Sequence, residues 1–256
     1  MRIVTLANHK GGVGKTTTAF NLAAGLKDKK KKVLLIDLDA QENLAFSCGV
    51  RNDDLKNHSL YDVFHGNANV NDCVFQIYDD IADFDILVGG AILRNADNDK
   101  KYVTADSILK ALRNLNTNYD FVVIDTPPSL NVLTESALKA ADDLIIPIQP
   151  SPFSLQGIGS LNGFVKSVNP KINVVGLLLV GVNERTNLGK EFIEIFKKTA
   201  KNNGTKLFKA MIHNSVAIPE SQINNSTIYD HAPNSTVAND YRAFVDEYLK
   251  GIKKNG

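Results

Sequence analysis

Short apolar stretches recur along the chain, and most of them are apolar throughout instead of alternating with polar residues. An alternating pattern predicts a strand with one face in water, whereas a continuous apolar run predicts a strand covered on both faces. The stretches of the second kind are 2–7, 33–37, 84–88, 120–125, 144–148, 174–180 and 206–212. We therefore expect a central sheet with helices packed against both faces.

Segments of helical periodicity lie between these strands, for example 104–115 and 187–201. The face expected to be buried in the second segment comprises Leu188, Phe192, Ile195 and Phe196. Because strand and helix alternate, consecutive strands are expected to run parallel and to be joined through helices. The sequence thus predicts an α/β fold with a mostly parallel sheet, and no linker divides residues 1–256 into two domains.

Composition narrows the class of protein. Of the 256 residues 43% are apolar, and the formal net charge of +1 predicts no nucleic-acid partner by itself, so such binding would need a local basic patch. The lysine-rich segment 27–32 is interpreted as a solvated turn. No apolar run approaches the roughly 20 residues that span a bilayer, and the chain does not begin with a signal-peptide pattern, so we expect a cytoplasmic protein without a membrane partner. Cys48 and Cys73 predict neither a disulfide framework nor a metal cluster.

A glycine-rich turn lies between the first expected strand and a helix, in the stretch HKGGVGKTT at 9–17. Three glycines allow a tight turn, and the backbone N–H groups and helix dipole then attract phosphate oxygens. In such a loop Lys15 would reach the β and γ phosphates of a nucleotide, and the Thr16 hydroxyl would bind Mg²⁺. The usual pattern GxxxxGK[ST] nevertheless fails, because His9 stands where its first glycine belongs and Lys10 precedes the glycines.

The sequence KGGVGKTT resembles the deviant Walker A signature of the ParA/Soj/MinD superfamily of ATPases. The segment DLDAQ at 37–41 is similar to the family's DxDPQ element, with alanine in place of proline, and FVVIDTPPSL at 121–130 is similar to its Walker B region. Residues 140–158 and 183–189 resemble the ParA/Soj branch in particular. The resemblance covers nearly the whole chain and implies a single-domain P-loop NTPase that uses ATP or ADP with Mg²⁺.

The resemblance also implies the residues of the nucleotide site. Expected nucleotide contacts are Lys10, Gly11, Gly12, Val13, Gly14, Lys15, Thr16, Thr17 and Asp37. Expected catalytic residues are Lys10, Lys15, Asp39 and Asp125, and expected metal-site residues are Thr16, Asp39 and Asp125. Three of these are aspartates at strand ends around one loop, where carboxylates can hold a metal-bound water or orient the attacking water.

Lys10 has a separate implied role. Phosphoryl transfer needs positive charge on its transition state, often from an arginine, and no arginine lies near this loop. In the family the signature lysine crosses a dimer interface to the nucleotide of the partner subunit. The resemblance therefore implies a homodimer with two ATP molecules between the chains. The stability of this dimer then depends on whether the γ-phosphate is present.

ParA/Soj relatives bind nonspecific DNA as ATP dimers and release it when a ParB-like centromere-binding partner stimulates hydrolysis. For this chain the resemblance implies plasmid or chromosome partitioning, with association with the nucleoid in the ATP state. Expected DNA contacts are Arg185, Lys190, Lys198 and Lys201. A solvated helix face explains the lysines equally well.

The segment IHNSVAIPES at 212–221 departs from the family pattern IPRNVRLSEA, because both arginines are absent. In the family this segment lines the adenine, through positions that fall on His213 and Ser215 here. DNA contact could then be weaker or be carried elsewhere, for example by Lys206, Lys209 or the tail with Lys250, Lys253 and Lys254.

A MinD-like switch that acts on a membrane or protein surface is the alternative to a partition ATPase. It would require an amphipathic terminal segment, but residues 249–256 contain only Leu249 and Ile252 as apolar residues. Cluster cysteines like those of the nitrogenase iron protein and the tyrosine-rich tail of related kinases have no counterpart in the sequence either. The partition ATPase is therefore the favoured hypothesis.

Overall fold

The computed structural model describes residues 1–51, 53–77 and 84–255, without the side chains of residues 156 and 253–255. Lys253 and Lys254 of the basic tail thus lie outside the described side chains. Within these described residues, eight strands form one sheet in the order β3-β4-β2-β5-β1-β6-β7-β8. Their bounds are β1 Arg2–Leu6, β2 Val33–Asp37, β3 Phe75–Gln76, β4 Phe84–Val88, β5 Phe121–Asp125, β6 Asp143–Ile148, β7 Asn173–Val182 and β8 Ile212–His213.

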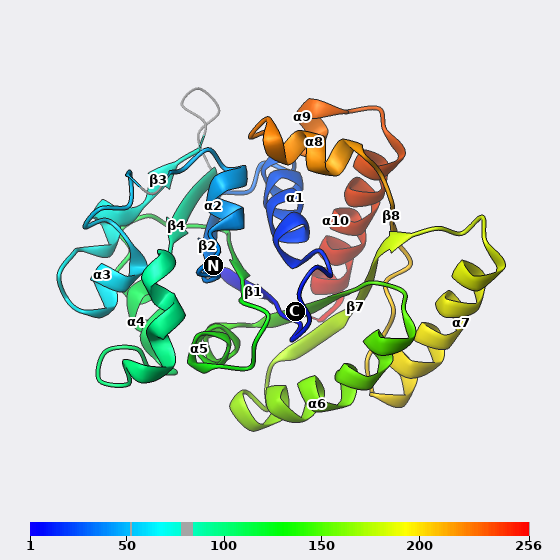
Figure 1. The fold of residues 1–256 in the computed structure, drawn as a ribbon, viewed down its shortest axis with the longest axis horizontal. Helices are drawn as coiled ribbons and strands as arrows, with labels where there is room; N and C mark the ends of the chain where they lie inside the picture. Colours follow the sequence, from blue (N-terminus) through cyan, green and yellow to red (C-terminus); the bar gives the residue numbers. More distant parts are fainter. Residues whose placement is uncertain (52, 78–83, 256) are drawn as a thin grey trace.

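Helices connect these strands and cover both faces of the sheet (Figure 1). The α-helices are α1 Lys15–Asp28, α2 Asn43–Ser47, α3 Leu60–Phe64, α4 Ser107–Arg113, α5 Val132–Ala140, α6 Pro152–Val168, α7 Asn187–Asn202, α8 Ala217–Ile223, α9 Ile228–His231 and α10 Thr236–Asn255. The segments Val70–Cys73 and Ala91–Asn98 form 3₁₀ helices. All described strand pairs are parallel except β3 with β4, so the predicted mostly parallel α/β fold is confirmed.

Alternate residues of the central strands enter different parts of the core. Val4 and Leu35 pack with helices α1 and α10, while Ile3 and Ile36 pack with α4 and α5 on the opposite face. Helices α6 and α7 cover the continuation of that second face over β6 and β7. Each fully buried side chain of this kind contributes about 1.5–3 kcal/mol, and most positions of the central strands are accordingly apolar.

Two details of the prediction were wrong. The expected strand 206–212 shortens to β8 with one isolated bridge at Leu207, because the N–H groups of Lys209 and Ala210 donate to the Glu247 carboxylate of α10. In α7, Leu188 is 61% exposed while Ile193 is buried beside Phe192 and Phe196. The buried face of α7 is thus rotated from the predicted one, since Leu188 lies in the first turn, at the edge of the contact.

Candidate functional site

The phosphate loop lies at the carboxyl ends of three neighbouring strands. Leu6 of β1 pairs with Asp125 of β5, and Asp125 in turn pairs with Asp37 of β2. Ligand sites of open α/β sheets form at this edge, where loops leave adjacent strands. The loop connects β1 to α1, which is preceded by Gly14. The fold therefore brings the glycine-rich turn and two of the predicted aspartates together.

Backbone geometry requires glycine at two loop positions. Gly12 and Gly14 have φ values of 72° and 83°, in the left-handed region that side chains disfavour. A Cβ at Gly14 would also lie 2.8 Å from Cγ1 of Val180, whereas a Cβ at Gly12 would meet nothing within 4 Å. Val13 between them is buried. The loop is therefore held in one tight conformation by packing against β7.

Lys15 places a positive charge at the beginning of α1. Its Nζ donates to the carbonyl oxygen of Lys10 at 3.1 Å, and the residue is only 6% exposed. Burial lowers the pKa of Lys15, and the nearby Asp125 and Asp39 oppose this shift. Gly14, the residue before α1, has no side chain to cap the helix, so the first N–H groups of α1 are not taken by a capping residue. This combination of free donors and an ammonium fits a phosphate group.

Thr16 and Asp125 form a pair of oxygen ligands beside this lysine. The Thr16 hydroxyl donates to Oδ2 of Asp125 at 2.6 Å, and Oδ1 of Asp125 is buried without a hydrogen-bond partner among the described residues. Burial raises the pKa of Asp125 to about 7, although the hydrogen bond from Thr16 and the charge of Lys15 oppose it. An orphaned carboxylate oxygen next to a hydroxyl fits a hard cation such as Mg²⁺.

Asp37 and Asp39 occupy different positions. Asp37 is fully buried and accepts the N–H groups of Asp39 and Ala45, both at 3.0 Å, so it shapes the turn before α2 and does not line the cavity. Burial and the neighbouring Asp125 raise the pKa of Asp37. Asp39 does line the cavity, and its Oδ1 accepts the N–H of Gln41. Of the two, Asp39 is thus the carboxylate that faces the cavity.

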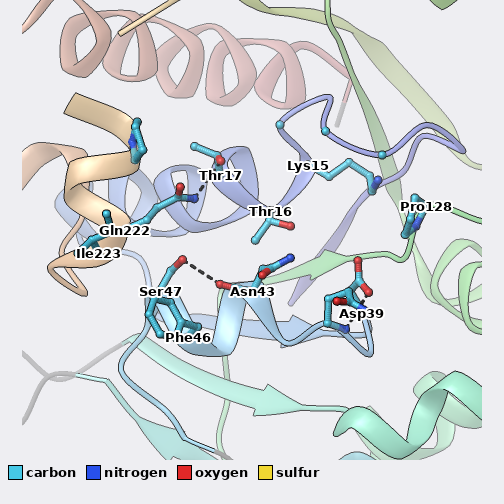
Figure 2. Close-up of a pocket in the computed structure, with 15 residues that line it drawn as sticks. Lys15, Thr16, Thr17, Asp39, Asn43, Phe46, Ser47, Pro128, Gln222 and Ile223 are labelled. Atoms are coloured by element: carbon cyan, nitrogen blue, oxygen red, sulfur yellow. Dashed lines mark hydrogen bonds between the residues drawn. The ribbon is translucent and has the colours of Figure 1, made fainter. Parts of the chain in front are cut away.

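A cavity of about 570 Å³ opens over the loop. Figure 2 shows Lys15, Asp39 and Pro128 at one end of it, and Phe46, Gln222 and Ile223 at the other. The lining residues are Gly11, Gly12, Gly14, Lys15, Thr16, Thr17, Asp39, Gln41, Asn43, Phe46, Ser47, Pro128, Pro219, Gln222 and Ile223. Gln222 closes this end by donating to the Thr17 hydroxyl at 3.1 Å.

Sequence reasoning missed the lining residues from α2 and α8. Pro128 carried a signal, because it stands in the Thr-Pro-Pro motif, but Phe46 and Gln222 stood in no recognised motif. His213 and Ser215, the expected adenine contacts, are not among the residues that line the cavity. Their role remains a prediction.

His213 bridges two carboxylates that, like His213 itself, do not line the cavity. Its Nδ1 lies 2.8 Å from Oδ2 of Asp240 on α10, and its Nε2 lies 3.2 Å from Oε2 of Glu184, which follows β7. Burial lowers the pKa of His213, but the hydrogen bonds to Asp240 and Glu184 outweigh it, so the pKa is raised. The imidazole ties the loop that carries Arg185 to β8 and α10.

The expected DNA contacts lie on the surface. Arg185 is exposed in the loop before α7, and the lysines at positions 190, 198 and 201 are exposed on that helix. Acidic residues share the surface of the helix, and Glu194 pairs with Lys197 at 2.6 Å. In the described part of the chain no helix is both long and apolar enough to cross a membrane.

Sequence comparisons relate this chain to one family and to several named proteins. The family described as AAA domain matches residues 1–175. The sporulation initiation inhibitor protein Soj of Bacillus subtilis is 34% identical over 252 residues, covering 96% of this chain and 97% of that protein. The chromosome-partitioning ATPase Soj of Thermus thermophilus is 32% identical over 258 residues, covering 99% and 98%. The chromosome partitioning protein ParA of Caulobacter vibrioides is 34% identical over 231 residues, covering 86% and 84%.

Solved structures share the whole fold. A putative plasmid partition protein from Borrelia burgdorferi bound to AMPPNP has a TM-score of 0.84 at 26% identity, covering 97% of this chain and 98% of that one. The cobyrinic acid a,c-diamide synthase of Mycobacterium smegmatis with bound ADP and magnesium also has a TM-score of 0.84, at 28% identity, covering 100% and 96%. Both similarities extend over nearly the full length of each chain.

Proposed function

We propose that this chain, which belongs to the ParA/Soj family of partition ATPases, uses ATP binding and hydrolysis to partition a plasmid or chromosome. The observation that carries the proposal is the combination of the buried Lys15 with the Thr16–Asp125 pair at the mouth of one cavity. A lysine at the beginning of a helix suits the β and γ phosphates, and the hydroxyl and carboxylate suit Mg²⁺. Bound Mg²⁺ would neutralise charge on the phosphate oxygens during transfer.

The chain's own residues supply the other requirements of hydrolysis. Asp39 lines the cavity at the same end as Lys15, where a carboxylate can accept a hydrogen bond from the attacking water and orient it. The Asp37 carboxylate accepts two hydrogen bonds, from the backbone N–H groups of Asp39 and Ala45, and so keeps the turn that carries Asp39 in place. We assign Asp39 to water positioning and Asp37 to the shape of the loop.

A second chain completes the site in this proposal. Lys10 is absent from the cavity-lining residues, and the Nζ of Lys15 already lies at its own loop. Lys10 then serves the nucleotide of a partner subunit, as the resemblance to the family implies. ATP would be held between two chains, and loss of the γ-phosphate would loosen the dimer.

The ATP dimer would bind nonspecific DNA through Arg185 and the lysines of α7. Phosphate contacts by exposed basic side chains give binding that depends on salt and not on base sequence. A ParB-like partner would stimulate hydrolysis and release the dimer from DNA. The protein would then alternate between the nucleoid and the cytoplasm according to its nucleotide.

Phosphate release from ATP is the direct test of the active site. We expect slow Mg²⁺-dependent release by the wild-type protein and loss of it in Lys15→Ala. Lys171→Ala is a matched control, because it removes an exposed lysine that does not line the cavity. Equal release by wild type and Lys15→Ala would contradict the assignment of the site.

A further inference from the structure

The residues that precede the loop glycines are held by elements outside the loop. The Asn8 side chain donates to the carbonyl oxygen of Pro147 in β6 at 2.8 Å and accepts the N–H of Lys10 at 3.1 Å. The Lys10 carbonyl in turn accepts a hydrogen bond from the Nζ of Lys15. The position of residues 8–10 therefore decides where the ammonium of Lys15 lies before a phosphate arrives.

His9 occupies a seat on α6 that exists because residue 157 is glycine. A Cβ at Gly157 would lie 1.7 Å from Cε1 of the His9 ring and 2.3 Å from its Nε2, so any residue with a Cβ would displace the ring. The same helix accepts the Lys10 ammonium at the carbonyl oxygen of Phe153. Two consecutive residues of the loop are thus held on the first two turns of α6.

Helical conformation does not require a glycine at position 157. Gly157 lies inside α6, and its φ is not in the positive range that favours glycine. Alanine is more favourable than glycine in the interior of a helix. Space for the His9 ring is therefore the reason that the structure offers for this glycine. By contrast, a Cβ at Gly159 or Gly163 of the same helix would meet nothing within 4 Å.

The His9 ring acts through its shape. Burial and the charges of Lys10 and Lys15 lower the pKa of His9, so the ring is neutral at pH 7. Its Nδ1 is buried and has no hydrogen-bond partner among the described residues. An uncharged ring of this kind is held by close packing, and its packing surface is the one that Gly157 leaves open.

We propose that His9 is a positioning residue for ATP binding, whose ring on Gly157 holds the Lys10 carbonyl and the Lys15 ammonium in place before the nucleotide binds. This inference rests on the proposed function, because it takes the loop around Lys15 as the phosphate site. His9 is not among the residues that line the cavity, so it acts through its neighbours. A loop that is already ordered loses less backbone entropy when the ligand binds, which increases affinity.

Equilibrium titration with AMPPNP and Mg²⁺ tests the assignment. We expect Gly157→Ala to weaken binding about 5- to 30-fold, the factor that corresponds to ordering one residue of backbone upon binding. Gly159→Ala is the matched control, because it makes the same change in the same helix where the new Cβ meets nothing within 4 Å. Its dissociation constant should stay within about twofold of wild type. Urea unfolding checks that each variant is folded under the binding conditions.

Variants of His9 separate the ring contact from a general effect on α6. His9→Ala should weaken binding by a similar factor, because the loop loses its seat. His9→Phe keeps a flat ring and should bind nearly as tightly as wild type. In the double variant His9→Ala/Gly157→Ala the new Cβ meets no ring, so this variant should bind no more weakly than His9→Ala alone.

The outcomes separate the two proposals. If wild type does not bind AMPPNP with Mg²⁺, the proposed function fails and this inference fails with it. If wild type binds and Gly157→Ala binds equally well, the positioning role is wrong while the proposed function stands. Two further results would overturn the positioning role: equal weakening by Gly157→Ala with and without the His9 ring, or binding by His9→Phe as weak as that by His9→Ala.

Discussion

Substituting the loop glycines separates two physical reasons for their presence. In Gly12→Ala the new Cβ meets nothing within 4 Å, so its cost is the positive φ of 72° alone. That conformation costs about 1–2 kcal/mol for an alanine, and reduced entropy of the unfolded chain returns about 0.4–1 kcal/mol. We expect Gly12→Ala to lower the free energy of unfolding by about 1 kcal/mol.

Gly14→Ala adds a steric term, because its Cβ would lie 2.8 Å from Cγ1 of Val180. Overpacking of this kind costs about 1–3 kcal/mol, which brings the expected loss to about 2–4 kcal/mol. Urea unfolding of Gly12→Ala measures the cost of the positive φ alone. A double-mutant cycle that combines Gly14→Ala with Val180→Ala then measures the steric cost separately. The double variant should recover part of the steric term. If Gly14→Ala is as stable as Gly12→Ala, packing of the loop on β7 does not fix its conformation.

Three further predictions concern charged groups. Lys10→Ala should bind ATP nearly as tightly as wild type but fail to form the ATP dimer, so normal dimers in sedimentation would refute its role across the interface. Asp39→Ala should form a persistent ATP dimer with little turnover, and rapid phosphate release would contradict water positioning. The stabilising effect of His213 depends on its charge, and its pKa rises from 6.5 on folding, so His213→Gln should lower the free energy of unfolding most at pH 5–6.5. The difference should shrink as the pH rises through the raised pKa; a constant or growing difference in urea unfolding would show that the pair with Asp240 and Glu184 is not charged.

Local sequence was sufficient for the loop and for the strand edges. The residues around Lys15 and Asp125 are fixed by short motifs, and the strands β1 and β5 that lead to them are mostly apolar. Their convergence follows from the rule that parallel strands bring their carboxyl ends to one edge. In the structure Asp37 of β2 is paired with Asp125 of β5, which confirms that these strand ends converge.

Contacts between distant segments could not be predicted in this way. Gln222 reaches Thr17 across 205 positions, and Lys10 reaches Phe153 across 143. Neither pair shows a local signal, because each depends on how whole helices pack. The strand expected at 206–212 failed for a similar reason, since Glu247 of α10 takes the N–H groups that a sheet neighbour would otherwise bond.

DNA retardation with ATP, with ADP and without nucleotide, each at two salt concentrations, tests the partition assignment most directly. We expect the protein to retard DNA only in the presence of ATP, whatever the DNA sequence. This binding should weaken steeply at the higher salt concentration, because it depends on phosphate contacts. Failure of ATP to promote binding even at low salt would contradict the account.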